Sequence, residues 1–255
     1  EKLVLDSGNF LHTASNPIIA GKIVDSTYMS RPSSVYISGR YAYVGGHYSD
    51  SLEIIDIFNP TNPQVVGKIA DSNYINSTES IYVSGSYAYM TSACPDSLAI
   101  IDISNSSKPK ITGGTIDSTY KNNINTPYAV YVSGSYAYVV NACSDSLIVF
   151  DITNLSDPQA VGTIKNSTYM NNASSVYVSG SYAYVTGGGY YSSLAVVDVS
   201  DPANPQVVGG VVNSTYMNGA RSVYVAGSHA YVAGYNSNSL AVVDVSNPAN
   251  PQVVG

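Results

Sequence analysis

Apolar and polar positions alternate along this chain in a block that occurs five times. A block opens with a short alternating segment such as Ser175–Ser179, passes through a glycine-containing pair, and resumes with a second segment such as Tyr182–Val185. A third segment, such as Leu194–Val199, is apolar at almost every position, and a fourth, such as Gln206–Gly209, follows an Asn-Pro turn. Short runs of this kind between turn residues predict strands, and no 3.6-residue periodicity of useful length predicts a helix. Each block therefore predicts four antiparallel strands.

The blocks follow one another at a nearly constant step of 46 to 49 residues, measured between the glycines that follow the first strand. These glycines are Gly39, Gly85, Gly134, Gly180 and Gly227. A period in the forties with several strands per unit is typical of a β-propeller, and a strand that is apolar on both faces needs a neighbouring sheet on each side. We therefore predict an all-β fold, a β-propeller of four-stranded antiparallel blades with five complete repeats and an N-terminal partial blade.

The N-terminal residues look like the second half of a further block. Residues 3–6 resemble a third strand and residues 16–21 a fourth. We divide the chain into residues 1–24, a partial blade or closing strands, and residues 25–255, a single five-repeat propeller domain. We expect five closed blades. The alternatives are a six-bladed ring whose missing strands come from residues outside this chain, and a neighbouring molecule that fills the half-blade, because an unpaired strand edge invites strand addition.

The third strands share a five-residue pattern that begins with Leu and ends with Asp. They are Leu52–Asp56, Leu98–Asp102, Leu147–Asp151, Leu194–Asp198 and Leu240–Asp244. These segments resemble the LVIVD repeat, found in β-propellers of bacterial and archaeal surface or secreted proteins. The flanking Tyr-Ala-Tyr-Val and Asn-Pro-Gln-Val-Val-Gly elements resemble the same repeat, over about residues 33–255. The resemblance implies the fold but no activity, because the family has none in common.

Composition narrows the partners. Charged residues are 11% of the chain, against roughly 25% in typical soluble domains, and the net charge is −7 with no basic run. This argues against nucleic acid and against an anionic membrane surface as partners. No stretch of about 18 apolar residues occurs, so we expect no transmembrane segment. The chain begins at Glu1 without a leader pattern, and we interpret it as a mature or excerpted segment.

Sequons and cysteines favour an extracellular or cell-surface location. Six Asn-X-Ser/Thr sequons indicate N-glycosylation sites at Asn76, Asn105, Asn154, Asn166, Asn172 and Asn213. Cys94 and Cys143 occupy the same place in adjacent repeats. A disulfide between them and two free thiols are both open, and the bridge would imply an oxidising compartment.

Two polar elements recur in the repeat. The aspartate that ends each third strand is expected to cap the next turn through side-chain-to-backbone hydrogen bonds, rather than to bind a metal. A tyrosine also precedes each first strand: Tyr28, Tyr74, Tyr120, Tyr169 and Tyr216. On a propeller these tyrosines would form a ring on one face, suited to stacking on sugars or to a protein interface. The alternative is that each tyrosine packs over the neighbouring blade and seals the groove.

The sequence holds no pattern of catalytic residues. The three histidines lie in different contexts, and no Gly-X-Ser-X-Gly, phosphate-binding loop or Cys-X-X-Cys occurs. Glu53 and Glu79 are the non-repeated internal glutamates; we expect Glu53 at a blade edge and assign neither a catalytic role. We expect no enzyme activity, no metal and no cofactor.

We therefore expect a non-catalytic extracellular propeller that serves as a structural or adhesive module of a cell surface. It would self-associate through the open half-blade or the tyrosine face, or bind other surface proteins. The alternative is a carbohydrate-binding module that holds glycans on its tyrosines. A glycan-active hydrolase or lyase is a third interpretation.

Overall fold

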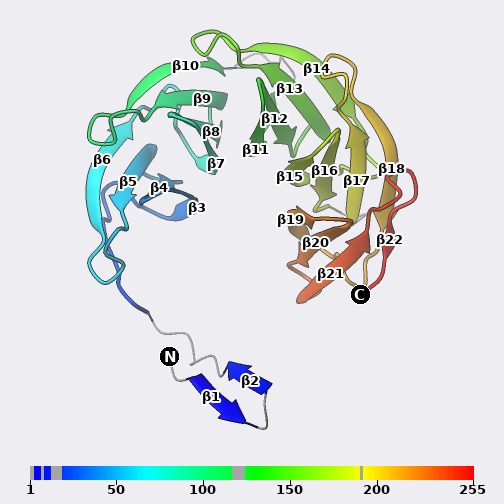
Figure 1. Cartoon of the computed structure of the whole chain (residues 1–255). Coiled ribbons are helices and arrows are strands. Elements are labelled where there is room, and N and C mark those ends of the chain that lie inside the picture. Colours follow the sequence, from blue (N-terminus) through cyan, green and yellow to red (C-terminus); the bar gives the residue numbers. More distant parts are fainter. Residues whose placement is uncertain (1–2, 7–8, 13–18, 117–123, 190–191) are drawn as a thin grey trace.

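The computed structural model describes residues 3–6, 9–12, 19–116, 124–189 and 192–255 (Figure 1). All regular structure in these residues is β-strand, arranged as five four-stranded antiparallel sheets and a separate hairpin. Within each sheet the strands follow chain order from the centre of the molecule outward (Figure 1). This arrangement confirms the predicted all-β fold with five four-stranded blades.

The strand bounds repeat from blade to blade. The separate hairpin is β1 (Leu3–Asp6) and β2 (Asn9–His12). Blade 1 is β3 (Pro32–Ser38), β4 (Tyr41–Gly46), β5 (Ser51–Asp56) and β6 (Gln64–Ala70). Blade 2 is β7 (Thr78–Ser84), β8 (Tyr87–Ala93), β9 (Asp96–Asp102) and β10 (Lys110–Ile116). Blade 3 is β11 (Pro127–Ser133), β12 (Tyr136–Asn141), β13 (Ser146–Asp151) and β14 (Gln159–Lys165). Blade 4 is β15 (Ala173–Ser179), β16 (Tyr182–Gly187), β17 (Ser193–Asp198) and β18 (Gln206–Val212). Blade 5 is β19 (Ala220–Ala226), β20 (His229–Gly234), β21 (Ser239–Asp244) and β22 (Gln252–Val253).

Short-range chemistry sets two turns in every blade. The inner hairpin turns through a glycine in the left-handed region, for example Gly134 with φ of 58°, which a side chain would disfavour. At the end of the third strand, the aspartate accepts a hydrogen bond of 2.8–2.9 Å from the backbone N–H two residues on, as from Ser200 to Asp198. The side chain and backbone of Ser200 together lower the pKa of Asp198. The predicted capping role of these aspartates is confirmed.

The core lies between blades rather than inside them. Four apolar clusters fill the layers between successive blades, and a fifth, smaller cluster covers the outer face of blade 1. The leucine that begins the third strand is fully buried in blades 1 to 4, as at Leu194. A strand that is apolar on both faces is stable only when a sheet covers each face. Each blade therefore depends on its neighbours for burial.

The blades form an arc whose two ends do not meet (Figure 1). Inner strands of successive blades pack side by side, but β19 does not pack along β3 in this way. Blade 1 consequently exposes 62% of Val35 and 63% of Ile37, at positions where the other blades bury their residues almost completely. At the other end, Leu240 is 62% exposed. The expected closure of five blades into a ring is wrong for this structure, because these apolar faces remain uncovered.

Glu53 lies inside the protein, and the expectation that it sits at a blade edge is wrong. It is fully buried in β5, and neither carboxyl oxygen has a hydrogen-bond partner. The other blades have Ala99, Ile148, Ala195 or Ala241 at this position. Burial, reinforced by the nearby Asp25 carboxyl and partly offset by Lys68, raises the pKa of Glu53 from its ordinary 4.5 to about 7.

The leucines of the third strand test the open arc. Replacing Leu194 with alanine should lower the free energy of unfolding by about 2–5 kcal/mol, because it removes methyl groups from a packed layer. Replacing Leu240, at the same repeat position, should cost less than about 1 kcal/mol, because this side chain already contacts solvent. Chemical denaturation of both variants measures the difference. Equal losses would show that another part of the molecule covers Leu240 in solution.

The buried carboxyl predicts a pH dependence of stability. Folded Glu53 keeps its proton up to about pH 7, whereas the unfolded chain releases it near pH 4.3. The unfolded state therefore binds fewer protons between these values, and the free energy of unfolding falls as pH rises through this window. Glu53→Gln should remove this loss and stabilise the protein at pH 8 by on the order of 2–3 kcal/mol, while changing little at pH 4. Denaturation at several pH values measures the free energy of unfolding of both proteins. If this free energy changes with pH in the same way in both, the raised pKa of Glu53 is wrong.

Candidate functional site

Every inner strand carries a β-bulge near its first residue, and the type of the bulged residue varies between the blades. The register between first and second strands skips one residue near the start of β3, β7, β11, β15 and β19. The skipped residues are Ser33, Glu79, Tyr128, Ser174 and Arg221. Bulges re-aim side chains and are frequent beside functional sites. Within a strand that otherwise repeats closely, this position holds five residues of four types.

These five residues line two adjoining clefts at the centre of the arc. One cleft, of about 130 Å³, is lined by Tyr128, Ser174 and Arg221, and also by Tyr235 and Asn236. The other, of about 290 Å³, is lined by seven residues. They are Arg31, Pro32, Ser33, His47, Glu79, Tyr128 and Arg221. Tyr128 and Arg221 belong to both clefts, so the two form neighbouring parts of one site, which we call the central site.

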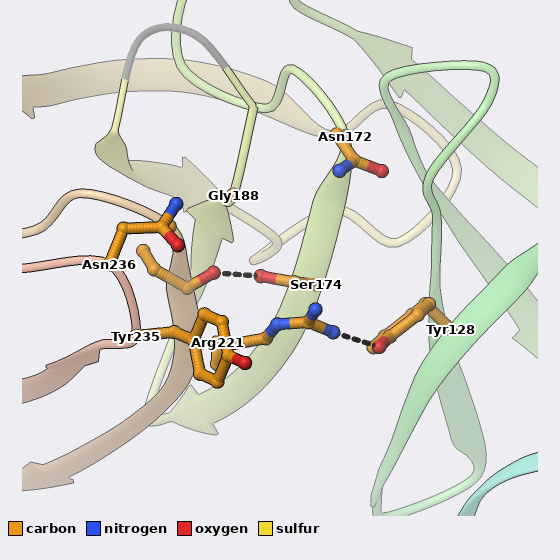
Figure 2. A pocket seen from close by; sticks show the side chains of 9 residues that line it. Tyr128, Asn172, Ser174, Gly188, Arg221, Tyr235 and Asn236 are labelled. Carbon is orange, nitrogen blue, oxygen red and sulfur yellow. Dashed lines mark hydrogen bonds between the residues drawn. The ribbon is translucent and has the colours of Figure 1, made fainter.

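Arg221 crosses the central site. Figure 2 shows its guanidinium extending from β19 past Tyr235 to the hydroxyl of Tyr128, to which it donates a hydrogen bond. The guanidinium carbon lies 5.4 Å from the centre of the Tyr235 ring and 5.9 Å from that of Tyr128. Cation–π contacts and one hydrogen bond thus hold the cation in place. Further N–H donors of the guanidinium are available to a ligand.

Blade 1 and blade 2 supply the other charges. His47 Nδ1 lies 3.4 Å from Glu79 Oε1 and 3.3 Å from the carbonyl oxygen of Thr78. Arg31 donates to the hydroxyl of Tyr48, with its guanidinium carbon 4.9 Å from that ring centre. Burial raises the pKa of Glu79, while His47, Arg221 and Arg31 act in the opposite direction. The central site therefore joins one partly desolvated carboxyl to two guanidinium groups and an imidazole.

The concentration of rare charged residues here is the main feature of the site. The chain has three arginines, three histidines and three glutamates. Arg31, Arg221, His47 and Glu79 all line one cleft. In a chain of net charge −7, this makes a local region of cationic character. Among the residues that the structure describes, no group of three or more His, Cys, Asp or Glu side chains could hold a metal ion.

The two serines at the bulge position tie neighbouring blades together. Ser33 donates to the carbonyl oxygen of Thr78 at 2.6 Å, and Ser174 donates to that of Ala220 at 2.5 Å. In both cases the acceptor directly precedes the bulged residue of the next blade. These bonds position Glu79 and Arg221, so the serines are supporting residues of the central site.

A row of tyrosines crosses the inner strands beneath the bulges. The rings of Tyr36, Tyr82, Tyr131, Tyr177 and Tyr224 follow one another with centroids 4.7–5.0 Å apart. Burial and the neighbouring phenols raise the pKa of Tyr177 to about 12. The Tyr177 hydroxyl therefore stays protonated at neutral pH and can act as a hydrogen-bond donor. The central row is a different set of tyrosines from the one singled out in the sequence.

The tyrosines that precede the first strands lie toward the rim. Lys68 of β6 sits over the ring of Tyr28, with its Nζ 3.8 Å from the ring centre. Tyr74 and Tyr169 pack against the apolar layers between blades. Tyr216 is half exposed, and Tyr120 lies outside the described residues. None of the four described tyrosines lines the central site. Three of them contact the fourth strand of their own blade: Tyr28 at Lys68, Tyr74 at Gly114 and Tyr169 at Gly210. A role for these tyrosines in a ligand or assembly face stays a prediction.

Of the remaining predicted residues, Asn172 lines the central site and the others do not. Cys94 and Cys143 are free and exposed, so the candidate disulfide is not formed in this structure. Thr126 Oγ1 lies 3.2 Å from Cys143 Sγ. Of the six sequon asparagines, Asn105, Asn154 and Asn172 are exposed, whereas Asn76, Asn166 and Asn213 are half-buried. Asn172 also lines the smaller cleft.

Sequence reasoning missed most of the central site, although a signal was present. Aligning the five repeats shows that the residue before Ser34, Ser80, Ala129, Ser175 and Ser222 varies in size and charge while its neighbours repeat. Repeated residues and known catalytic patterns do not include this position, because it holds four residue types in the five blades. The loops between second and third strands also contribute to the site, through His47 and Tyr235.

Solved structures share this fold. The periplasmic gluconolactonase of Pseudomonas aeruginosa is 17% identical, with a TM-score of 0.70 over 88% of this chain and 68% of that one. A putative 6-phosphogluconolactonase from Bacteroides fragilis is 13% identical, with a TM-score of 0.69 over 90% of this chain and 74% of that one. A functionally unknown protein from Desulfotomaculum acetoxidans is 13% identical, with a TM-score of 0.69 over 88% and 69%. No curated protein matches the chain.

These findings correct the expected function. The structural neighbours include lactonase-type proteins, and they lend no support to a structural or adhesive module that assembles through a half-blade or a tyrosine face. At such low identity the likeness shows the fold alone. No helix in the described part of the chain has the length and apolar character needed to cross a membrane.

The sequence itself settles the family. The model of the LVIVD repeat matches five successive segments that cover most of the chain. They are residues 31–71, 76–115, 128–166, 171–212 and 219–255. Each segment takes in one of the five blades, so this propeller belongs to the LVIVD repeat family.

Proposed function

We propose that this propeller binds a small, anionic, hydroxyl-rich molecule of the sugar-acid class at the central site. The observation that carries the proposal is the convergence of Arg31, Arg221, His47 and Glu79, drawn from a chain with only 11% charged residues. Guanidinium groups recognise carboxylates and phosphates through paired hydrogen bonds. Phenol, serine and asparagine groups around them suit the hydroxyls of a sugar chain. The fold likeness to gluconolactonase-type proteins agrees with this ligand class.

The geometry supports separate roles for the two ends of such a ligand. Arg221 is already oriented by Tyr128 and Tyr235, so it would lose little side-chain entropy on binding an anionic group. Tyr128, Ser174 and Asn236 lie around the same cleft as neutral polar groups. Glu79 would accept hydrogen bonds from ligand hydroxyls when it is ionised.

A second candidate function is hydrolysis of a sugar lactone, and the Glu79–His47 pair favours it. A carboxylate whose pKa is raised by burial is suited to take a proton from water. The water oxygen would then attack the lactone carbonyl, with Arg31 or Arg221 stabilising the oxyanion. As the ring C–O bond breaks, the leaving alkoxide takes a proton from Glu79 or His47, and the product is the open hydroxy acid. The sequence-based expectation that the chain is not an enzyme stays a prediction that this candidate puts to the test.

Extracellular location also stays a prediction. The six sequons and the low content of charged residues support this location. Mass spectrometry of the secreted protein would test it by showing which sequons carry a glycan.

Binding is tested by calorimetric titration with gluconate and 6-phosphogluconate. Arg221→Gln should weaken binding by about 10-fold or more, because hydrogen bonds to a charged group contribute about 1.5–3 kcal/mol. Arg40→Gln is the matched control. Arg40 is the third arginine of the chain, and it pairs with Asp56 away from the central site, so its loss should leave affinity unchanged. Absence of binding by the unmodified protein, or equal effects of the two substitutions, would refute the proposed site.

Hydrolysis is tested separately, by following acid release from δ-gluconolactone above its spontaneous rate. If Glu79 is the base, Glu79→Gln should reduce kcat by about 100-fold or more, with ligand affinity altered far less. A protein that binds the acid but leaves lactone hydrolysis at the spontaneous rate is a binding protein only. In that case the second candidate is wrong and the first stands.

A further inference from the structure

The two ends of the arc present complementary halves of one interface. At each of the four interfaces within the arc, two aliphatic residues of an inner strand, such as Val223 and Val225, pack against the preceding blade. The preceding blade supplies an aromatic and two aliphatic residues, such as Tyr184, Leu194 and Val196. Blade 1 exposes the first half of this interface at Val35 and Ile37, and blade 5 exposes the second half at Tyr231 and Leu240. Each end of the arc therefore presents one half of the interface, and no described residue of the chain covers it as a neighbouring blade would.

A segment with the sequence of an outermost strand lies beside blade 1. Residues 16–25 read Asn-Pro-Ile-Ile-Ala-Gly-Lys-Ile-Val-Asp, and residues 62–71, the outer strand of blade 1, read Asn-Pro-Gln-Val-Val-Gly-Lys-Ile-Ala-Asp. Gly21 lies so close to blade 1 that a Cβ would collide with the carbonyl oxygen of Pro60. Gly67 has the same relation to Ser106 of blade 2, and Gly209 to Pro248 of blade 5.

Packing agrees with this assignment. Ile23 contacts the apolar cluster on the outer face of blade 1, as Ile69 contacts the layer between blades 1 and 2. Residues 19–24 nevertheless pair with no other strand in the described part of the chain, and Ile19 and Val24 are exposed. The segment thus occupies the place of a fourth strand whose three inner partners are missing from beside it.

We infer that the opening of the arc is a docking site for the three inner strands of a further LVIVD blade, with residues 19–24 as its outermost strand. The occupant is a three-stranded antiparallel unit with the aliphatic and aromatic alternation of the repeat itself. One of its faces would cover Val35 and Ile37, and its third strand would pair with residues 19–24. Its other face would pack against the exposed wall of blade 5, at Tyr231 and Leu240. Backbone pairing and burial of two apolar walls would provide the stability.

The experiment adds such a unit to the full chain. A copy of residues 210–246 is added after Gly255, because Gly255 corresponds to Gly209 in the repeat. The first residues of the copy then complete the fourth strand of blade 5, and the rest supply the three inner strands of a further blade. We expect Tm to rise by roughly 5 °C or more, and the backbone amides of residues 19–24 to exchange with deuterium at least about 10-fold more slowly, because they become paired.

Leu240→Asp is the control for docking. In the 255-residue chain this substitution should leave Tm nearly unchanged, whereas in the extended chain it should remove most of the gain. A second extended variant carries residues 219–249 in place of residues 1–15, which places the added strands directly before Asn16; here Val35→Asp is the matching control. This variant keeps the test open if the first does not fold.

Several outcomes would overturn the inference. If the backbone amides of residues 19–24 exchange at the same rate in both extended chains as in the 255-residue chain, this segment does not serve as the outer strand of an added blade. Equal effects of Leu240→Asp with and without the added unit would show that the wall of blade 5 does not receive it. If the 255-residue chain associates head to tail and Leu240→Asp dissolves the assembly, a second copy covers the wall and the proposed occupant is wrong.

Discussion

The packing of one blade against the next is the interaction on which this structure depends. The third strand is apolar on both faces in blades 2 to 5, so a single blade has no core of its own. Successive blades approach each other closely, because glycines such as Gly67 and Gly162 leave room for a backbone carbonyl oxygen in a turn of the next blade. Stability in such an array is approximately a sum over neighbouring interfaces. The ends of the arc are accordingly where burial is incomplete.

The same constraint separates scaffold from site. Residues that face a neighbouring blade must keep their size and apolar character, so they repeat. The bulged residue of each inner strand faces the centre and has no partner of fixed shape, so Ser33, Glu79 and Tyr128 can occupy equivalent positions without disturbing the sheets. Five equivalent positions around one centre can thus build a site of mixed chemistry from a uniform frame.

Charge is used sparingly in this protein, and its location is informative. Arg40, in the turn between β3 and β4, pairs with Asp56 at the end of β5, and the Arg40 side chain is exposed there. Arg31 and Arg221 instead donate hydrogen bonds to phenolic hydroxyls, and no carboxylate in the described part of the chain forms an ion pair with them. Glu79 and Glu53 show two outcomes of burial. Glu79 lies near three basic groups in a cleft, whereas Glu53 is enclosed near another carboxyl. Both carboxyls have raised pKa values, but ligands can reach only Glu79.

The sequence by itself determined the blades: a constant step, alternating strands, turn glycines and capping aspartates are all local patterns, and local geometry follows from them. The sequence also identifies the family, because the LVIVD repeat is a contiguous sequence pattern. Only the tertiary structure decided which residues meet. Arg31 and Arg221 are far apart along the chain, and their meeting depends on the curvature of the arc and on five bulges that no single repeat reveals. Glu53 is buried on the outer face of blade 1, near Asp25 of the segment that precedes this blade. The openness of the arc was likewise decided by which neighbouring blade is present, since one strand pattern is buried beside a neighbour and exposed without one.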